Sequence, residues 1–147
     1  MHTIAAAGAG FLIAVLWFDL MFDVQARGGG PLATDAALGS ISAYYRRVTT
    51  EASPMGRLIS LVMLATVAAL VARIVRGEGP LWAGAVSLAA ALVGMGLALA
   101  RTVRNAVRLG AATDPPEVRT ILARRILGDH LISLAAMSVV LALQIAT

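Results

Sequence analysis

Four long apolar stretches, separated by polar segments, dominate the pattern of the chain. They cover about residues 4–24, 55–75, 81–103 and 126–146. Each is close to the roughly 20 apolar residues that a helix needs to cross the hydrocarbon core of a bilayer. The tight turn "RGEGP" at residues 76–80 makes the second and third helices antiparallel neighbours. We therefore predict four membrane-spanning helices in one domain, residues 1–147.

Two of these helices are expected to continue beyond their apolar stretches. The segment "RTVRNAVRLG" follows the third stretch with no helix breaker before Gly110, which the pattern favours as the C-cap. The segment "TDPPEV" then has the character of a helix start, with Thr113 or Asp114 as the cap. Because proline suits the first turn of a helix, the fourth helix is predicted to begin near Pro115.

The 30-residue link between the first two spans, residues 25–54, carries a helical pattern of its own. Its large apolar residues recur at the spacing of one helix face: Leu38, Ile41, Tyr45 and Val48. We predict an amphipathic helix over about residues 34–50 that lies at the membrane interface. The expected fold is all-α, an integral membrane four-helix bundle with this additional interfacial helix.

The composition agrees with a membrane protein and excludes several kinds of chemistry. Hydrophobic residues make up 59% of the chain, the mean hydropathy is +0.84, and only 14% of residues are charged, against roughly 25% in soluble domains. With no Cys and two His, disulfides and zinc or copper centres are not expected, and no metal or cofactor is predicted. No phosphate-binding loop, serine-nucleophile motif or nucleic-acid module is present. The first apolar stretch lacks the basic start of a signal peptide, so we interpret it as a retained span.

The basic residues are distributed unevenly between the two ends of the predicted bundle. All 12 are Arg, and ten fall at one end: Arg27, Arg46, Arg47, Arg57, Arg101, Arg104, Arg108, Arg119, Arg124 and Arg125. Since positive loops stay cytoplasmic, both termini are predicted to face away from the cytoplasm of a bacterial inner membrane. Anionic lipids of the cytoplasmic leaflet are then the expected partners of this end.

Acidic and polar residues also gather at the arginine-rich end of the spans. Asp19 and Asp23 are four residues apart and so share a helix face. Ionisable groups at membrane depth normally face the bundle interior and pair with one another. We expect these two carboxylates to pair with Arg57 and with the Arg residues of the third span. The candidate ligand-binding residues are Asp19, Asp23, Arg57, Arg101, Arg104, Asn105, Arg125 and Asp129, with His130 beside them.

Three interpretations of this cluster remain open from the residues alone. Paired charges can serve only to fix the register of the helices. The same groups can form a polar pocket that binds a molecule, or a path for protons or ions. His130 is likewise either a hydrogen-bonded bundle residue or a catalytic base.

Four residues near the ends of the last two spans resemble a known family. Arg104 and Asn105 in "RTVRNAVRLG", with Arg125 and His130 in "ARRILGDHLIS", look like the small four-span anthrone-oxygenase-like membrane proteins. The resemblance covers about the last third of the chain. It implies cofactor-free oxidation of a lipophilic aromatic substrate, with His130 as the catalytic base.

The leading functional hypothesis is a small inner-membrane protein whose polar cluster binds a lipophilic molecule with a polar head, or which serves as the accessory subunit of a membrane complex. The cofactor-free oxygenase is the alternative, and a small proton-coupled transporter is the third hypothesis. A homo-oligomer or a membrane-complex partner is compatible with each.

Overall fold

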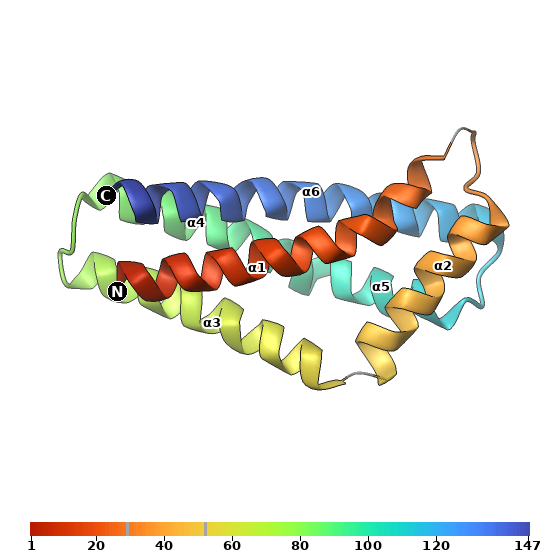
Figure 1. Ribbon diagram of the computed structural model, residues 1–147, viewed down its shortest axis with the longest axis horizontal. Helices are drawn as coiled ribbons and strands as arrows, with labels where there is room; N and C mark the ends of the chain where they lie inside the picture. The colour runs from red at the N-terminus through yellow and green to blue at the C-terminus, as the bar shows by residue number, and fades with distance from the viewer. Residues whose placement is uncertain (29, 52) are drawn as a thin grey trace.

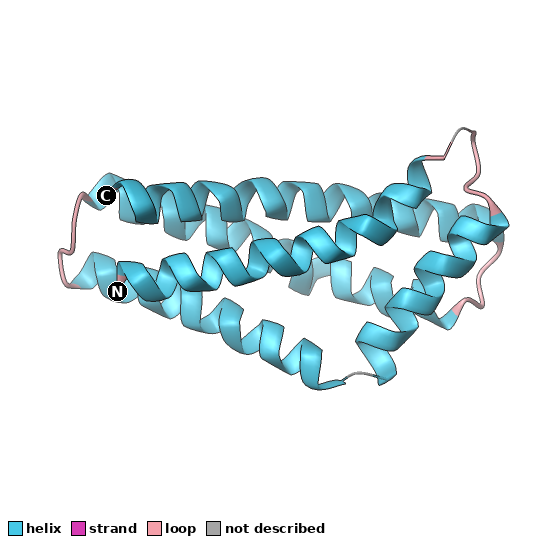
Figure 2. Ribbon diagram, in the orientation of Figure 1, coloured by secondary structure: helices cyan, strands magenta, loops and turns pink. Residues whose placement is uncertain are grey.

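The computed structural model describes residues 1–28, 30–51 and 53–147, and all the regular structure in this part of the chain is helical (Figure 2). The elements in chain order are α1 (His2–Asp23), η1 (Val24–Arg27), α2 (Asp35–Arg46), η2 (Arg47–Glu51), α3 (Ser53–Val75), α4 (Leu81–Leu97), η3 (Ala98–Thr102), α5 (Val103–Ala111) and α6 (Pro116–Ala146). The segments η2 and η3 are turns of π-helix, and η3 joins α4 to α5 without a break. The fold is the predicted all-α bundle.

The four long helices form a ring in which neighbours run in opposite directions. Helix α1 packs on α3 and α6, and α4 packs on the same two helices (Figure 1). Four helices are long and apolar enough to cross a membrane: His2–Arg27, Pro54–Val75, Leu81–Ala111 and Pro116–Ala146. This confirms the four predicted spans, including the extension of the third helix and the early start of the fourth.

Small residues bring the helices of the bundle close together. A Cβ atom built on Gly8 of α1 would lie 2.1 Å from the Thr66 hydroxyl of α3. One built on Gly84 of α4 would lie 2.8 Å from the Ile74 side chain of α3. Both distances are below 3.0 Å, so a larger residue at either position would force a neighbouring side chain to move, and glycine allows α3 to cross these two helices closely.

The predicted caps between the third and fourth helices are wrong. The residue with a left-handed backbone is Ala112, at φ 55°, and not Gly110. Gly110 is instead where α5 meets α2, because a Cβ there would lie 2.7 Å from the backbone nitrogen of Arg46. Helix α6 begins after Pro115 without a side-chain cap, since Asp114 accepts hydrogen bonds from Arg108 at 2.7 and 2.8 Å.

The predicted amphipathic helix forms as α2, with the Thr34 hydroxyl accepting a hydrogen bond from the Ala37 backbone as its N-cap. Its apolar face packs against α5 and α6, where Leu38, Ile41 and Tyr45 are at most 3% exposed. The helix therefore lies on the bundle itself, across the arginine-rich end (Figure 1).

Two arginines of α6 hold α2 and the preceding loop in place. Arg119 donates hydrogen bonds to the Leu38 carbonyl at 3.0 Å and to the Ser42 hydroxyl at 2.8 Å. Arg124 donates to the backbone carbonyl of Ala26 in η1 and to those of Gly30 and Pro31 in the loop that precedes α2. The partners of both guanidinium groups are therefore neutral oxygens. These two arginines hold α2 and the chain before it against α6, in addition to any effect of their charge on membrane orientation.

Candidate functional site: a lateral groove with a polar wall

A groove of about 1060 Å³ opens at the arginine-rich end of the bundle. Within the described residues, α3 contacts α1 and α4 but neither α5 nor α6, so the first half of α3 stands apart from η3 and α5. Figure 1 shows this divergence of α3 from α5. The volume is slightly above the range of roughly 300–1,000 Å³ found for small-molecule sites, which suits a ligand as large as a lipid.

The groove is lined mainly by apolar side chains, and its two edges are apolar as well. Leu61 and Leu64 of α3 are 64% and 61% exposed, and Leu99 of η3 on the opposite edge is 73% exposed. Because these edges belong to helices that are long and apolar enough to cross a membrane, the groove would open toward the acyl chains in a bilayer. Its inner end is formed by residues near the middle of the spans: Leu12, Thr66, Ala91 and Met137.

Asp23 is the centre of the polar cluster beside the groove. Its side chain is fully buried, and both of its oxygens are used. Oδ1 accepts a hydrogen bond from the Tyr45 hydroxyl at 2.6 Å, and Oδ2 lies 2.6 Å from His130 Nδ1. This carboxylate therefore ties together α1, α2 and α6, because each supplies one member of the contact.

Asp19 lies one turn earlier on α1 and forms part of the groove wall. Its Oδ1 accepts a hydrogen bond from the Tyr44 hydroxyl at 2.5 Å. Its Oδ2 lies 3.8 Å from His130 Nε2, which is too long for a hydrogen bond. The Asp19 side chain is 15% exposed and that of His130 is 11% exposed, and both line the groove. These two side chains thus give the apolar groove a polar wall.

Asp129 is next to His130 in sequence but faces a different helix. Arg101 of η3 holds it through Nε, at 2.9 and 3.0 Å from the two carboxylate oxygens, and through Nη2. The Thr102 hydroxyl also lies 3.0 Å from Asp129 Oδ2 and 3.0 Å from the Leu97 carbonyl, five residues back along the π-turn. The π-turn therefore places Arg101 and Thr102 together over Asp129.

The predicted pairing of Asp19 and Asp23 with arginine is wrong. Among the described residues no Arg forms an ion pair with either carboxylate, and Arg101 is bonded to Asp129. Arg57 is exposed at the start of α3, where it lines the mouth of the groove. The His130 ring faces both carboxylates and provides a positive charge there when it is protonated.

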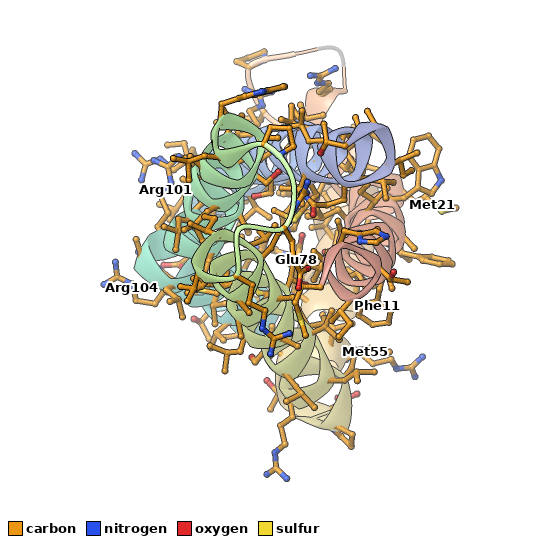
Figure 3. The ribbon with its side chains drawn as sticks, turned by 90° about the vertical axis from the view of Figure 1, so that its left-hand side faces the viewer. Phe11, Met21, Met55, Glu78, Arg101 and Arg104 are labelled. Carbon is orange, nitrogen blue, oxygen red and sulfur yellow. The ribbon has the colours of Figure 1, made fainter. Side chains whose placement is uncertain are left out.

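The remaining predicted site residues lie away from the groove wall. Arg104 is exposed and donates a hydrogen bond to the Ala100 carbonyl of its own helix. In Figure 3 its side chain projects outward from the bundle. Arg125 is exposed, and Asn105 is half-buried. The structure therefore brings together Asp19, Asp23 and His130 but leaves these three side chains outside that group.

Tyr44 and Tyr45 also belong to the site, although the sequence pattern identified only Tyr45, as part of the apolar face of the amphipathic helix. Burial, followed by the nearby carboxylates of Asp19 and Asp23, raises the pKa of both phenols, so both hydroxyls stay protonated donors. The Tyr44 ring also stacks on Phe22 with ring centres 4.1 Å apart. A usable signal was present in Tyr45: a tyrosine on the apolar face of a helix needs a hydrogen-bond partner when it is buried, and Asp19 and Asp23 were candidate acceptors.

Comparisons with protein-family models, with curated proteins and with solved structures returned no match to this chain.

Proposed function

We propose that this protein binds a lipophilic molecule with a polar head in the lateral groove. The observation that carries the proposal is the position of Asp19 and His130 on the wall of a groove that is lined mainly by apolar side chains. A ligand tail would lie along α3 and α4 toward Leu12 and Met137, and its head would reach the polar wall. Leu12 and Asp19 are seven residues apart on α1, so the apolar inner end extends about 10 Å beyond the polar wall.

The proposal is tested by filling the groove. Ala98→Phe places a ring on the lining of η3, whereas the matched substitution Ala89→Phe lies on an exposed position of α4 outside the groove. Protein is purified in mild detergent, and bound lipophiles are extracted and identified by mass spectrometry. We expect a molecule that co-purifies with the unmodified protein and with Ala89→Phe to be lost from Ala98→Phe. Equal retention by both variants would contradict binding in the groove.

A second candidate function, cofactor-free oxygenation, is favoured by the contact between His130 and Asp23. A buried carboxylate on Nδ1 fixes the ring and leaves Nε2 as the atom that can take a proton. In this reaction Nε2 would accept a proton from an acidic C–H group of a lipophilic aromatic substrate. Dioxygen would oxidise the resulting carbanion, with one oxygen atom entering the product as a carbonyl and the other leaving as water.

The oxygenase candidate is tested by measuring oxygen uptake with a lipophilic anthrone. Uptake that exceeds the spontaneous rate and is lost in His130→Gln would support it. Uptake at the spontaneous rate would leave binding without turnover. No contact among the described residues favours the third hypothesis, proton-coupled transport. The same holds for a role as an accessory subunit.

We further propose that the arginine-rich end faces the cytoplasm of a bacterial inner membrane and contacts its anionic lipids. The support is the distribution of charge, with ten of 12 Arg at this end. The chain contains no Cys, so a single introduced thiol reports only its own position. In intact cells, Cys at exposed Ala36 should resist an impermeant maleimide, whereas Cys at exposed Arg76 should react. The opposite pattern would reverse the orientation.

A further inference from the structure

The polar wall of the groove has two atoms whose hydrogen-bonding capacity the described residues leave unused. Both oxygens of Asp23 are occupied, and Asp19 Oδ1 accepts from Tyr44. Asp19 Oδ2 and His130 Nε2 face each other at 3.8 Å, beyond hydrogen-bond distance. These are the atoms with which the head of a bound molecule would interact.

The separation of these two atoms suits one bridging oxygen. An oxygen placed about 2.8 Å from each of them satisfies ordinary hydrogen-bond distances to both. A hydroxyl group can donate to Asp19 Oδ2 and at the same time accept from Nε2 when the ring is protonated. When the ring is neutral, Nδ1 keeps its hydrogen for Asp23, and the hydroxyl can donate to either acceptor. A hydroxyl head therefore fits both states of the histidine.

An anionic head would meet the opposite conditions. Carboxylates and fully ionised phosphates have only acceptors to offer at this wall, and Asp19 Oδ2 is itself an acceptor. Two carboxylates, Asp19 and Asp23, face one imidazole, so the wall carries no surplus of positive charge. Like charges brought together at a poorly hydrated site repel strongly.

We propose that the groove selects lipophilic molecules with an uncharged hydroxyl head, which bridges Asp19 Oδ2 and His130 Nε2, and that Asp19 excludes carboxylate and phosphate heads. This inference rests on the proposed binding function and adds the chemical class of the ligand. Arg57, at the mouth of the groove, is the cation that could favour the opposite selection.

The test compares three sixteen-carbon amphiphiles that differ only in the head: hexadecanol, hexadecyl phosphate and hexadecylamine. Radiolabelled forms are partitioned between phosphatidylcholine nanodiscs with and without the protein. We expect hexadecanol to be retained at least about tenfold more tightly than hexadecyl phosphate, a difference equivalent to about 1.4 kcal/mol. Because this ranking is measured on the unmodified protein, it does not depend on whether any variant folds.

Two variants then locate the source of the selection. Asp19→Asn removes the charge and supplies an amide donor, so it should bring hexadecyl phosphate to within about threefold of hexadecanol. Asp35→Asn is the control, since it removes an exposed carboxylate from the start of α2, away from the groove. The control should preserve the ranking.

Each other outcome overturns the inference in a distinguishable way. Hexadecyl phosphate bound as tightly as the alcohol, and lost in Arg57→Gln, would show that the arginine at the mouth selects an anion. Tighter binding of hexadecylamine than of the alcohol would show selection of a cation. If none of the three is retained above the protein-free nanodiscs, the proposed binding function itself fails.

Discussion

His130 Nδ1 lies 2.6 Å from Asp23 Oδ2, although 107 positions separate the two residues in the chain. The contact joins α1 to α6, and the two side chains are only 0% and 11% exposed. Tyr45 adds a second hydrogen bond to the same carboxylate from α2. A buried carboxylate held by two donors on two other helices is a strong constraint on how those helices are placed.

The first prediction is that Asp23→Asn lowers the stability of the bundle more than the same substitution at an exposed aspartate does. The amide cannot accept at both positions, so one of its former donors loses its acceptor. We expect a loss of about 2–4 kcal/mol, as for other buried, charge-assisted hydrogen bonds. Tyr45→Phe should cost less, because the carboxylate keeps His130. Combining the two should cost less than their sum, since they share one interaction.

The measurement is reversible unfolding in detergent for the single variants, the double variant and Asp35→Asn as an exposed control. Strict additivity of Asp23→Asn and Tyr45→Phe would mean that the phenol does not depend on the carboxylate.

The second prediction concerns the unequal exposure of Arg101 and Asp129. The arginine side chain is 52% exposed, whereas that of the aspartate is 1% exposed. Removing the arginine leaves a buried carboxylate with Thr102 as its remaining donor, while removing the carboxylate leaves an arginine that can reach solvent. We expect Arg101→Gln to cost about 2–3 kcal/mol and Asp129→Asn about 1 kcal/mol.

The same asymmetry predicts a rescue. Adding Asp129→Asn to Arg101→Gln should restore part of the stability, because it removes the uncompensated buried charge. The measurement is the stability of the two single variants and the double variant in thermal unfolding. A double variant less stable than Arg101→Gln would show that the buried carboxylate does not need this arginine.

The third prediction uses the fact that the chain has two tyrosines, both in the site. Burial and the neighbouring carboxylates raise the pKa of Tyr44 and of Tyr45, so neither should ionise near its usual pH of about 10. A raised pKa in the folded state gives a stabilisation that is complete below pH about 10 and is lost as the pH rises beyond it.

Tyrosinate absorbance in the ultraviolet measures this directly. The folded protein should show little tyrosinate until it begins to unfold in strong alkali, and denatured protein should titrate with a pKa near 10. Tyr44→Phe should halve the final amplitude. A native titration that matches the denatured one would mean that both hydroxyls are open to water.

The helices could be predicted from the sequence because the membrane imposes strict requirements on length and composition. A span needs about 20 apolar residues, and this requirement was enough to predict all four long helices. The helical spacing of Leu38, Ile41 and Tyr45 predicted α2, because residues at this spacing form one apolar face that must be buried. Alternating helix directions also placed the acids, arginines and His130 at one level of the bundle.

The partners of the charged residues could not be predicted. The sequence indicates how far along the bundle axis a residue lies, but it does not define the direction in which its side chain points around the helix. Asp129 and His130 are consecutive, yet they lie about 100° apart around α6 and bond to different helices. The π-turn that places Arg101 over Asp129 has no recognised sequence signal here. Gly110 was misassigned for a similar reason: its role depends on where Arg46 of another helix passes.

The last prediction tests the close crossing of α1 and α3 with two glycines on one helix. A methyl group on Gly8 would lie 2.1 Å from the Thr66 hydroxyl, whereas one on Gly10 would meet no atom within 4 Å. Gly8→Ala should therefore destabilise the bundle by about 1–3 kcal/mol through overpacking. Gly10→Ala should be neutral or stabilising by up to about 1 kcal/mol, because alanine is the better helix former.

Thr66→Ala supplies the decisive third substitution. It removes the hydroxyl that blocks the methyl group and leaves the Thr66 Cβ position, 3.3 Å away, as the nearest atom. The double variant Gly8→Ala/Thr66→Ala should thus recover most of the stability lost by Gly8→Ala alone, as measured by unfolding in detergent. If Gly8→Ala is as harmless as Gly10→Ala, the two helices do not approach as closely as described. In that case α3 could also swing toward α5 and narrow the groove, and retention of lipophiles should be measured again in that variant.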